Sequence, residues 1–275
     1  MLLPLTDLQG MGGLPGVEFQ FVMKILCQLF LASLRIGSFL IASPFFGGTY
    51  VPLQVRIIIS VLLGLSVMSM VDVPSLETLD QMSLVGVIVT EIAVGVSAGL
   101  ILTIWFSAVL LAGEKIATSA GLGYAAQIDP DSGGQTPIVS KMFNMLMIVV
   151  FLSMNGHLVV LRTMMKSYQH LPVGQSPHFG ALVEGGIAAA GHMFFAASII
   201  MVPIGIGMLL INLAIGVMTR SAPQLNLFSF GFPITLLSVF LMLYLSVDTL
   251  AFALNDLVIS SMNNLEVVMG RAIYG

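Results

Sequence analysis

Continuous apolar blocks, separated by short polar joints, make up most of this sequence. Each block has the length of a membrane-crossing helix, which needs about 20 apolar residues, and none shows the alternation of a membrane β-strand. We therefore expect an all-α membrane protein. The predicted helical blocks are residues 20–43, 51–71, 82–112, 142–161, 186–218 and 227–254.

The joint from Gly113 to Lys141 is the longest. It is dense in glycine and proline, which oppose a regular helix. A joint of this length inside a compact protein is more often functional than passive. Its helix-opposing residues are Gly113, Gly121, Gly123, Pro130, Gly133, Gly134 and Pro137.

Three bulky side chains, Leu122, Tyr124 and Ile128, stand among small residues in this joint, in the stretch GLGYAAQIDP. An apolar loop at membrane depth is tolerated only where it is buried in protein or lines a cavity. Apolar constrictions can also close pores by excluding water. A channel plug is therefore one interpretation, and an ordinary surface loop fits the same residues equally well.

The last two blocks are joined only by the short stretch from Thr219 to Asn226. Helices with such a short connection pack as an antiparallel hairpin. The first helix of this hairpin should end near Arg220, because Ala222 precedes Pro223 and is pushed out of the helical region. We expect the hairpin to be a semi-independent unit.

Composition and charge agree with the membrane class and narrow the function. The chain has 275 residues, of which 57% are hydrophobic and only 8% are charged. The net charge is −4 and the nine basic residues are scattered singly, so no basic patch could bind nucleic acid. The single cysteine, Cys27, excludes an intramolecular disulfide. No catalytic or nucleotide-binding motif and no metal-like histidine spacing is present, so we expect neither an enzyme nor a cofactor or metal.

Glu91 is an acidic residue well inside the block 82–112. A charge at such a position is a functional candidate, because lipid cannot solvate it. A proton relay would need a second intramembrane acid or base, and none accompanies it in the sequence. We favour a protonated or hydrogen-bonded glutamate at a subunit interface. The positive-inside rule orients the helices only weakly, which is consistent with helices that are held by other subunits.

Four stretches resemble, in this order, the FliR family of flagellar biosynthesis proteins and its injectisome counterparts, the T-type subunits of the type III secretion export gate. They are PFFGGTYVPLQVR at 44–56, AGEKIATSAGLGYAAQIDP at 112–130, NGHLVVLR at 155–162 and NLAIGVMTRSAPQLNLFSFGFP at 212–233. The resemblance covers nearly the whole chain, and the pattern RxxPQxNxFxxGFP is long enough to be specific.

The resemblance implies a subunit of the flagellar export gate in the bacterial inner membrane, at the flagellar basal body. In this family one such chain assembles with several FliP and FliQ subunits, lifted largely out of the bilayer, around a channel for unfolded flagellar proteins. Residues 1–185 would be a FliP-like part that includes a plug loop at about 113–141, and residues 186–275 a FliQ-like hairpin and tail. Lipid and other export apparatus membrane proteins are further expected partners.

The resemblance also assigns roles to single residues. It places the plug at Gly121 to about Gly134, with Leu122, Tyr124 and Ile128 as the closed constriction. The loop hinges are Gly113, Gly121, Gly123, Gly133 and Gly134, and Gly113 and Glu114 form the base of the loop. The residues assigned to subunit contacts are Glu114, Asn212, Arg220, Pro223, Gln224 and Asn226, in addition to Glu91, which its position inside an apolar block already places at a subunit interface.

Three alternatives stay open. An injectisome export gate subunit has the same overall pattern. A secondary transporter would need ionisable residues that converge at the bilayer midplane, where Glu91 alone is thin support. An intramembrane hydrolase would need a nucleophile and a base in a recognisable arrangement.

Overall fold

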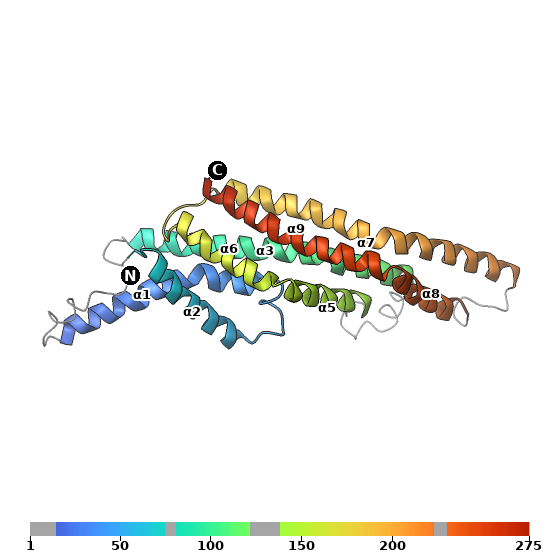
Figure 1. Cartoon of the computed structure of the whole chain (residues 1–275), viewed down its shortest axis with the longest axis horizontal. Helices are drawn as coiled ribbons and strands as arrows, with labels where there is room; N and C mark the ends of the chain where they lie inside the picture. The colour runs from blue at the N-terminus through green and yellow to red at the C-terminus, as the bar shows by residue number, and fades with distance from the viewer. Residues whose placement is uncertain (1–14, 75–80, 122–137, 223–229, 275) are drawn as a thin grey trace. The chain divides into compact units, whose positions relative to one another are not determined.

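The computed structural model of the chain describes residues 15–74, 81–121, 138–222 and 230–274, and every regular element in these ranges is helical (Figure 1). This confirms the all-α class. The helices are α1 (Pro15–Ala42), α2 (Leu53–Met70), α3 (Gln81–Ser119), α5 (Ile138–Ser153), α6 (Gly156–His170), α7 (Phe179–Ser221), α8 (Phe232–Leu245) and α9 (Val247–Tyr274).

Two predicted blocks are broken inside apolar sequence. The block 142–161 is divided at Asn155, whose φ of 56° lies in the left-handed region that asparagine tolerates better than most residues. The block 227–254 is divided at Ser246, where α8 and α9 meet at a bend of 65°. Both breaks escape the sequence pattern, because the residues on either side are as apolar as the rest of the block.

Several helices extend beyond the predicted limits. Helix α3 passes through Gly113 to Ser119, so the expectation that the joint begins at Gly113 is wrong. Helix α6 continues to His170, and α9 continues to Tyr274 through residues that we expected to be a tail. The last turns of α9 bury Leu265, Val268 and Ala272, which recur at helical spacing. Packing of this buried face stabilises a helix whose mean hydropathy is too low to identify it in the sequence.

Four helices are long and apolar enough to cross a membrane, and up to six spans result if each bent helix pair counts as one. The chain is therefore a polytopic membrane protein. Helix α3 has 39 residues and α7 has 43. At 1.5 Å per residue they measure about 58 and 64 Å, roughly twice the thickness of a hydrocarbon core. Neither can lie within the core along its whole length unless it is strongly tilted.

The chain forms two compact units that interleave along the sequence. Unit 1 contains residues 1–103, 157–187 and 262–275, and unit 2 contains residues 104–156 and 188–261. Helices α3, α7 and α9 each contribute one part to each unit. The division into a FliP-like part and a FliQ-like hairpin concerns likeness to other subunits and stays a prediction.

Unit 1 is built on close packing between α1 and the first half of α3. Gly95 lies against the backbone of Arg35 and the side chain of Ser38, and a Cβ on Gly99 would come within 2.6 Å of the Ala42 side chain. The residue numbers of the contacting positions rise together along α1 and α3, so these helices run parallel. The Gly95–Gly99 pair therefore allows the close helix approach that small residues permit.

Replacing Gly95 by alanine should destabilise unit 1, because the new methyl group would overlap the carbonyl of Arg35. We expect a loss of about 1–3 kcal/mol, as for other overpacked cores. The matched control is Gly86→Ala in the same helix, where nothing lies within 4 Å of the added Cβ. Thermal unfolding in detergent, followed by circular dichroism, should show a lower midpoint for Gly95→Ala only. Equal midpoints would contradict the tight packing.

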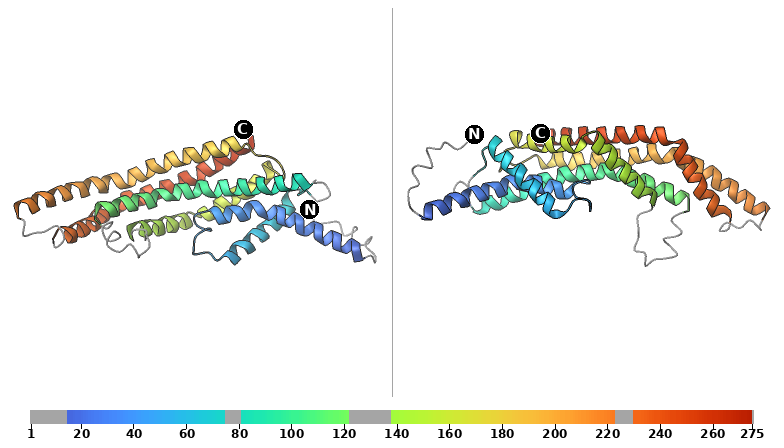
Figure 2. Two further views of the ribbon diagram at one scale, coloured as in Figure 1. Left: turned by 180° about the vertical axis from the view of Figure 1, so that it is seen from behind. Right: turned by 60° about the horizontal axis from the view of Figure 1, so that its bottom comes forward.

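In unit 2, helix α3 packs against α7 and against α5. The ribbons of α3 and α7 run in the same direction (Figure 2). The contacts agree, because Trp105 stacks on His192 with ring centroids 5.7 Å apart and Asn212 bonds to Ser119 further along both helices. The α3–α5 pair is antiparallel, since Phe106 contacts Phe151 while Leu110 contacts Ser140.

Helix α7 runs antiparallel to the helices that follow it. In unit 2 a Cβ on Gly207 would meet the sulfur of Met242 at 2.9 Å, and in unit 1 Gly185 lies against Val268. The partner's residue number falls as the number along α7 rises. The antiparallel order agrees with the short connection, and the hairpin as a semi-independent unit stays a prediction.

Candidate functional site at the ends of the loop between α3 and α5

Helix α3 ends at a glycine in the left-handed conformation. Gly121 has φ of 80°, and its N–H donates to the carbonyl of Thr118 at 3.0 Å. The preceding N–H, of Ala120, donates to the carbonyl of Ile116 at 3.1 Å. Glycine commonly ends helices in this way, because it adopts a positive φ without steric cost. The predicted hinge Gly121 therefore lies at the exact turn by which the chain leaves α3.

Side chains from the C-terminal helices bind the last carbonyls of this end. The amide Nδ2 of Asn212 in α7 donates to the carbonyl of Ser119 at 3.0 Å. The hydroxyl of Thr235 in α8 lies 3.1 Å from the carbonyl of Ala120 and shares its one hydrogen between this carbonyl and that of Phe232 in its own helix, at 2.9 Å. The last carbonyls of a helix have no partner within that helix, so these donors satisfy groups that would otherwise need water. Two later helices thus hold the start of the loop.

The other end of the loop is attached to α3 as well. Helix α5 begins at Ile138, and the hydroxyl of Ser140 in its first turn donates to the carbonyl of Leu110 at 3.2 Å. Gly113 makes this approach possible, because a Cβ there would come within 2.6 Å of the Cα of Ser140. Gly113 is thus a packing position inside α3. Both ends of the loop are fixed to the last three turns of one helix.

The residues between these anchors lie outside the described part of the chain. They include the predicted constriction and most of the predicted hinges: Leu122, Gly123, Tyr124, Ile128, Gly133 and Gly134. The assigned contact residues Pro223, Gln224 and Asn226 lie outside it too. Their roles stay predictions.

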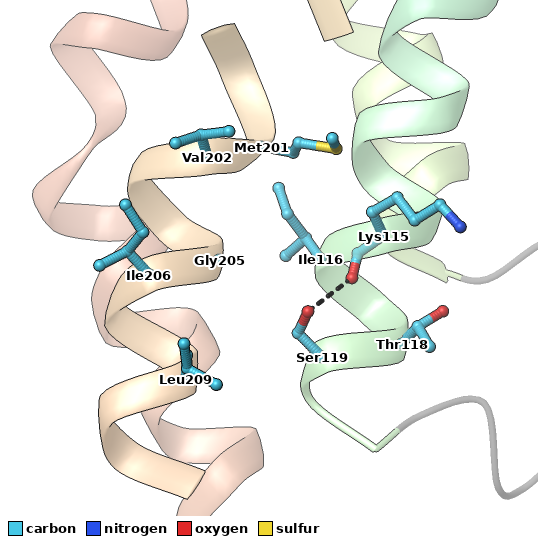
Figure 3. Close-up of a pocket in the computed structure, with 9 residues that line it drawn as sticks. All are labelled: Lys115, Ile116, Thr118, Ser119, Met201, Val202, Gly205, Ile206 and Leu209. Carbon is cyan, nitrogen blue, oxygen red and sulfur yellow. Dashed lines mark hydrogen bonds between the residues drawn. The ribbon is translucent and has the colours of Figure 1, made fainter. Parts of the chain in front are cut away.

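A groove of about 350 Å³ opens beside the start of the loop, between the end of α3 and α7 (Figure 3). Helix α7 lines it with Met201, Val202, Ile206 and Leu209, whereas α3 contributes Lys115 and hydroxyl groups. The hydroxyl of Ser119 donates to the Lys115 carbonyl at 2.9 Å and is therefore already bonded. The groove is mostly apolar and can accept an apolar side chain or lipid tail.

Removing one anchor should loosen the start of the loop. Asn212→Ala leaves the Ser119 carbonyl without its side-chain donor. The loss of this hydrogen bond should lower the free energy of opening the loop by about 1 kcal/mol, which raises the population of the open loop roughly fivefold. We expect chymotrypsin to cleave after Tyr124 about fivefold faster in detergent-solubilised protein. The control is Asn255→Ala, because the Asn255 amide bonds to the Ala251 carbonyl of its own helix at 2.9 Å. Equal rates for both variants would show that Asn212 does not anchor the loop.

Unit 1 contains a buried ion pair that joins α1 and α3. Arg35 Nε donates to Oε2 of Glu91 at 2.8 Å, and Nη2 donates to Oε1 at 3.0 Å. The two side chains are 0% and 1% exposed. The expectation that no second intramembrane acid or base accompanies Glu91 is therefore wrong, because Arg35, 56 positions away in the chain, meets it in the fold. Bidentate geometry of this kind gives the strong form of an arginine–carboxylate contact.

Helix α6 completes the surroundings of Arg35. Nη1 donates to the hydroxyl of Ser167 at 3.1 Å, and Nη2 donates to the carbonyl of Leu171 at 3.0 Å. The guanidinium carbon lies 4.1 Å from the centre of the Tyr168 ring, a cation–π geometry. Every nitrogen of the guanidinium thus has a partner within this chain. The cluster holds three helices together and leaves no free group for the substrate of a transporter.

The remaining assigned contact residues are placed as follows. Glu91 finds its partners inside the chain, and Asn212 uses its amide on Ser119. Glu114 is exposed on α3, and Arg220 is exposed in the last turn of α7, where a basic residue complements the helix dipole. Contacts of these residues with another subunit stay predictions. Within the described residues, no group of three His, Cys, Asp or Glu side chains could hold a metal ion.

Comparisons with known proteins match most of the chain. The family described as bacterial export proteins, family 1, matches residues 26–260. A flagellar biosynthetic protein FliR from Bacillus subtilis is 30% identical over 90% of this chain and 98% of its own length. The FliR proteins of Pectobacterium carotovorum and Escherichia coli are 33% and 31% identical, over 76% and 74% of this chain and 80% and 77% of theirs.

Proposed function

The chain belongs to the bacterial export proteins of family 1, and from this membership we propose that it is a subunit of the flagellar protein export gate in the bacterial inner membrane. Its role is to help form and gate the channel through which unfolded flagellar proteins leave the cytoplasm. The observation that carries the gating role is the fastening of the loop between α3 and α5, whose start is bonded to α7 and α8 and whose end is bonded to α3.

The apolar surface of the chain supports assembly with other subunits. Large apolar side chains that are more than half exposed follow α7 and α8 over most of their lengths. They include Phe194, Phe195, Leu209, Leu210, Leu213, Leu237, Tyr244 and Leu245. Helix α7 is also about twice as long as a hydrocarbon core is thick, so lipid covers only part of this surface when the helix stands upright. FliP-type and FliQ-type subunits are the partners that we assign to the rest.

The loop is the proposed plug. We place it at Gly121 to Gly134, with Leu122, Tyr124 and Ile128 as the apolar constriction. A constriction of this kind closes a pore by excluding water and ions. The hydrogen bonds at Ser119, Ala120 and Ser140 would hold the two ends of the loop in place while the residues between them move aside for a passing substrate. The role is mechanical, and no catalytic step is assigned to the chain.

Co-extraction tests the assembly. The chain, tagged and expressed with FliP-type and FliQ-type subunits from the same bacterium, should purify with both of them in mild detergent. A chain that purifies only as a monomer or homodimer under these conditions contradicts the proposal. The matched control is the same experiment with an unrelated polytopic membrane protein as bait, which should recover neither subunit.

A further inference from the structure

Helix α6 has a buried face and an exposed face of different chemistry. The buried face carries Val160, Met164, Ser167 and Tyr168, and it packs against α1 through the Arg35 cluster. The exposed face presents Leu158, Val159, Arg162, Lys166 and Gln169, which recur at helical spacing. Other parts of the chain cover the buried face of α6, so only the face with Arg162 and Lys166 is exposed.

The charge on this face is uncompensated. Residues 142–183 contain no aspartate or glutamate, although the chain as a whole has a net charge of −4. Arg162 and Lys166 have no ion-pair partner among the described residues, where the one recorded salt bridge is that of Arg35 with Glu91. That pair is fully buried and compensates itself. The exposed face therefore presents two positive charges on an otherwise acidic protein.

The order of exposed residues along α6 indicates which kind of molecule contacts this face. Helix α6 exposes Leu158 and Val159 (56% and 39%) in its first turn and Arg162 and Lys166 one to two turns later. Apolar surface followed by arginine and lysine is the order found where hydrocarbon gives way to lipid headgroups.

We propose that the exposed face of α6, with Arg162 and Lys166, binds the phosphate groups of anionic phospholipids. The guanidinium of Arg162 suits bidentate binding of a phosphate, and the ammonium of Lys166 adds a second positive charge one turn away. Leu158 and Val159 lie beside the first acyl carbons. This site is independent of the export channel, so it can fail without affecting the proposed function.

The test compares lipid retention by two variants of the full chain. Wild-type protein in mixed micelles of phosphatidylglycerol and phosphatidylcholine with identical acyl chains should retain phosphatidylglycerol preferentially in native mass spectrometry. In Arg162→Gln/Lys166→Gln we expect this preference to fall roughly thirtyfold, about fivefold for each basic residue. The control Lys24→Gln/Lys141→Gln removes two exposed basic residues elsewhere and should keep the preference. Circular dichroism verifies that both variants are folded.

Two results would overturn the proposal. One is an equal loss of preference in both variants, because net charge rather than this face would then control lipid binding. The other is unchanged phosphatidylglycerol retention in Arg162→Gln/Lys166→Gln, because the lipid preference would then come from elsewhere on the chain. Retained preference in the control with a loss confined to the α6 variant supports the lipid site.

Discussion

Glu91→Leu is expected to abolish the accumulation of folded protein. The substitution leaves the guanidinium of Arg35 buried at 0% exposure without its carboxylate, while Ser167 and Leu171 offer it only neutral acceptors. Removing one partner of a buried ion pair costs about 3–5 kcal/mol, which is a large part of the stability of an ordinary domain. Fluorescence-detected gel filtration of a tagged chain should show aggregate in place of the monodisperse peak.

The double variant Arg35→Met/Glu91→Leu separates charge from packing. It removes both charges and retains apolar volume, so it should recover much of the folded yield that Glu91→Leu loses. Glu114→Leu is the control for the loss of one negative charge on the same helix, because Glu114 is exposed. If the double variant is as defective as Glu91→Leu, the pair does not act through an unpaired buried charge.

If the loop is the proposed plug, deletion of Gly121 to Gly134 should open an ion leak in cells that express the chain with FliP-type and FliQ-type subunits, its proposed partners. Without the constriction, the channel would have no apolar barrier at this level, and water and ions would enter it. The leak should slow growth in high salt and depolarise the membrane, as a potential-sensitive dye would report. Unchanged permeability in an intact assembly would make the loop a passive connection.

A milder variant guards against a deletion that disrupts the assembly. Leu122→Ser/Tyr124→Ser/Ile128→Ser retains the length of the loop and removes only its bulky apolar groups. It should leak less than the deletion but more than the wild type. The matched control is Leu53→Ser/Ile57→Ser/Val61→Ser, because these exposed side chains of α2 lie outside the loop. Co-purification of the partners from the same cells verifies that each assembly is intact.

The helices and their order could be predicted from the sequence, because long apolar blocks report directly on membrane helices. The end of α7 at Ser221 follows from Pro223, and the hairpin follows from the short connection. The amphipathic helices were harder to detect. Residues 162–170 and 255–274 contain too many polar groups to register as apolar blocks, and they are helical because their buried faces find partners in the fold.

The polar contacts could not be predicted, since each joins residues far apart in the chain. In the sequence Arg35 is a single basic residue in an apolar stretch, and nothing there connects it with Glu91 or Ser167. The GxxxG pair at Gly95 and Gly99 signals a close helix approach but not the identity of the neighbour. Asn212 is conspicuous as a polar residue in an apolar helix, yet its acceptor lies 93 positions earlier.

The anchoring of the loop by Asn212 and Thr235 has a consequence for biosynthesis. The acceptors Ser119 and Ala120 are translated early, whereas their donors follow 93 and 115 residues later. A ribosome that has passed Lys141 has therefore produced the complete loop but neither of these anchors. Both of these hydrogen bonds can form only after Thr235 has been translated. A transcript truncated before that codon would yield a chain with a loop that lacks one of its anchors.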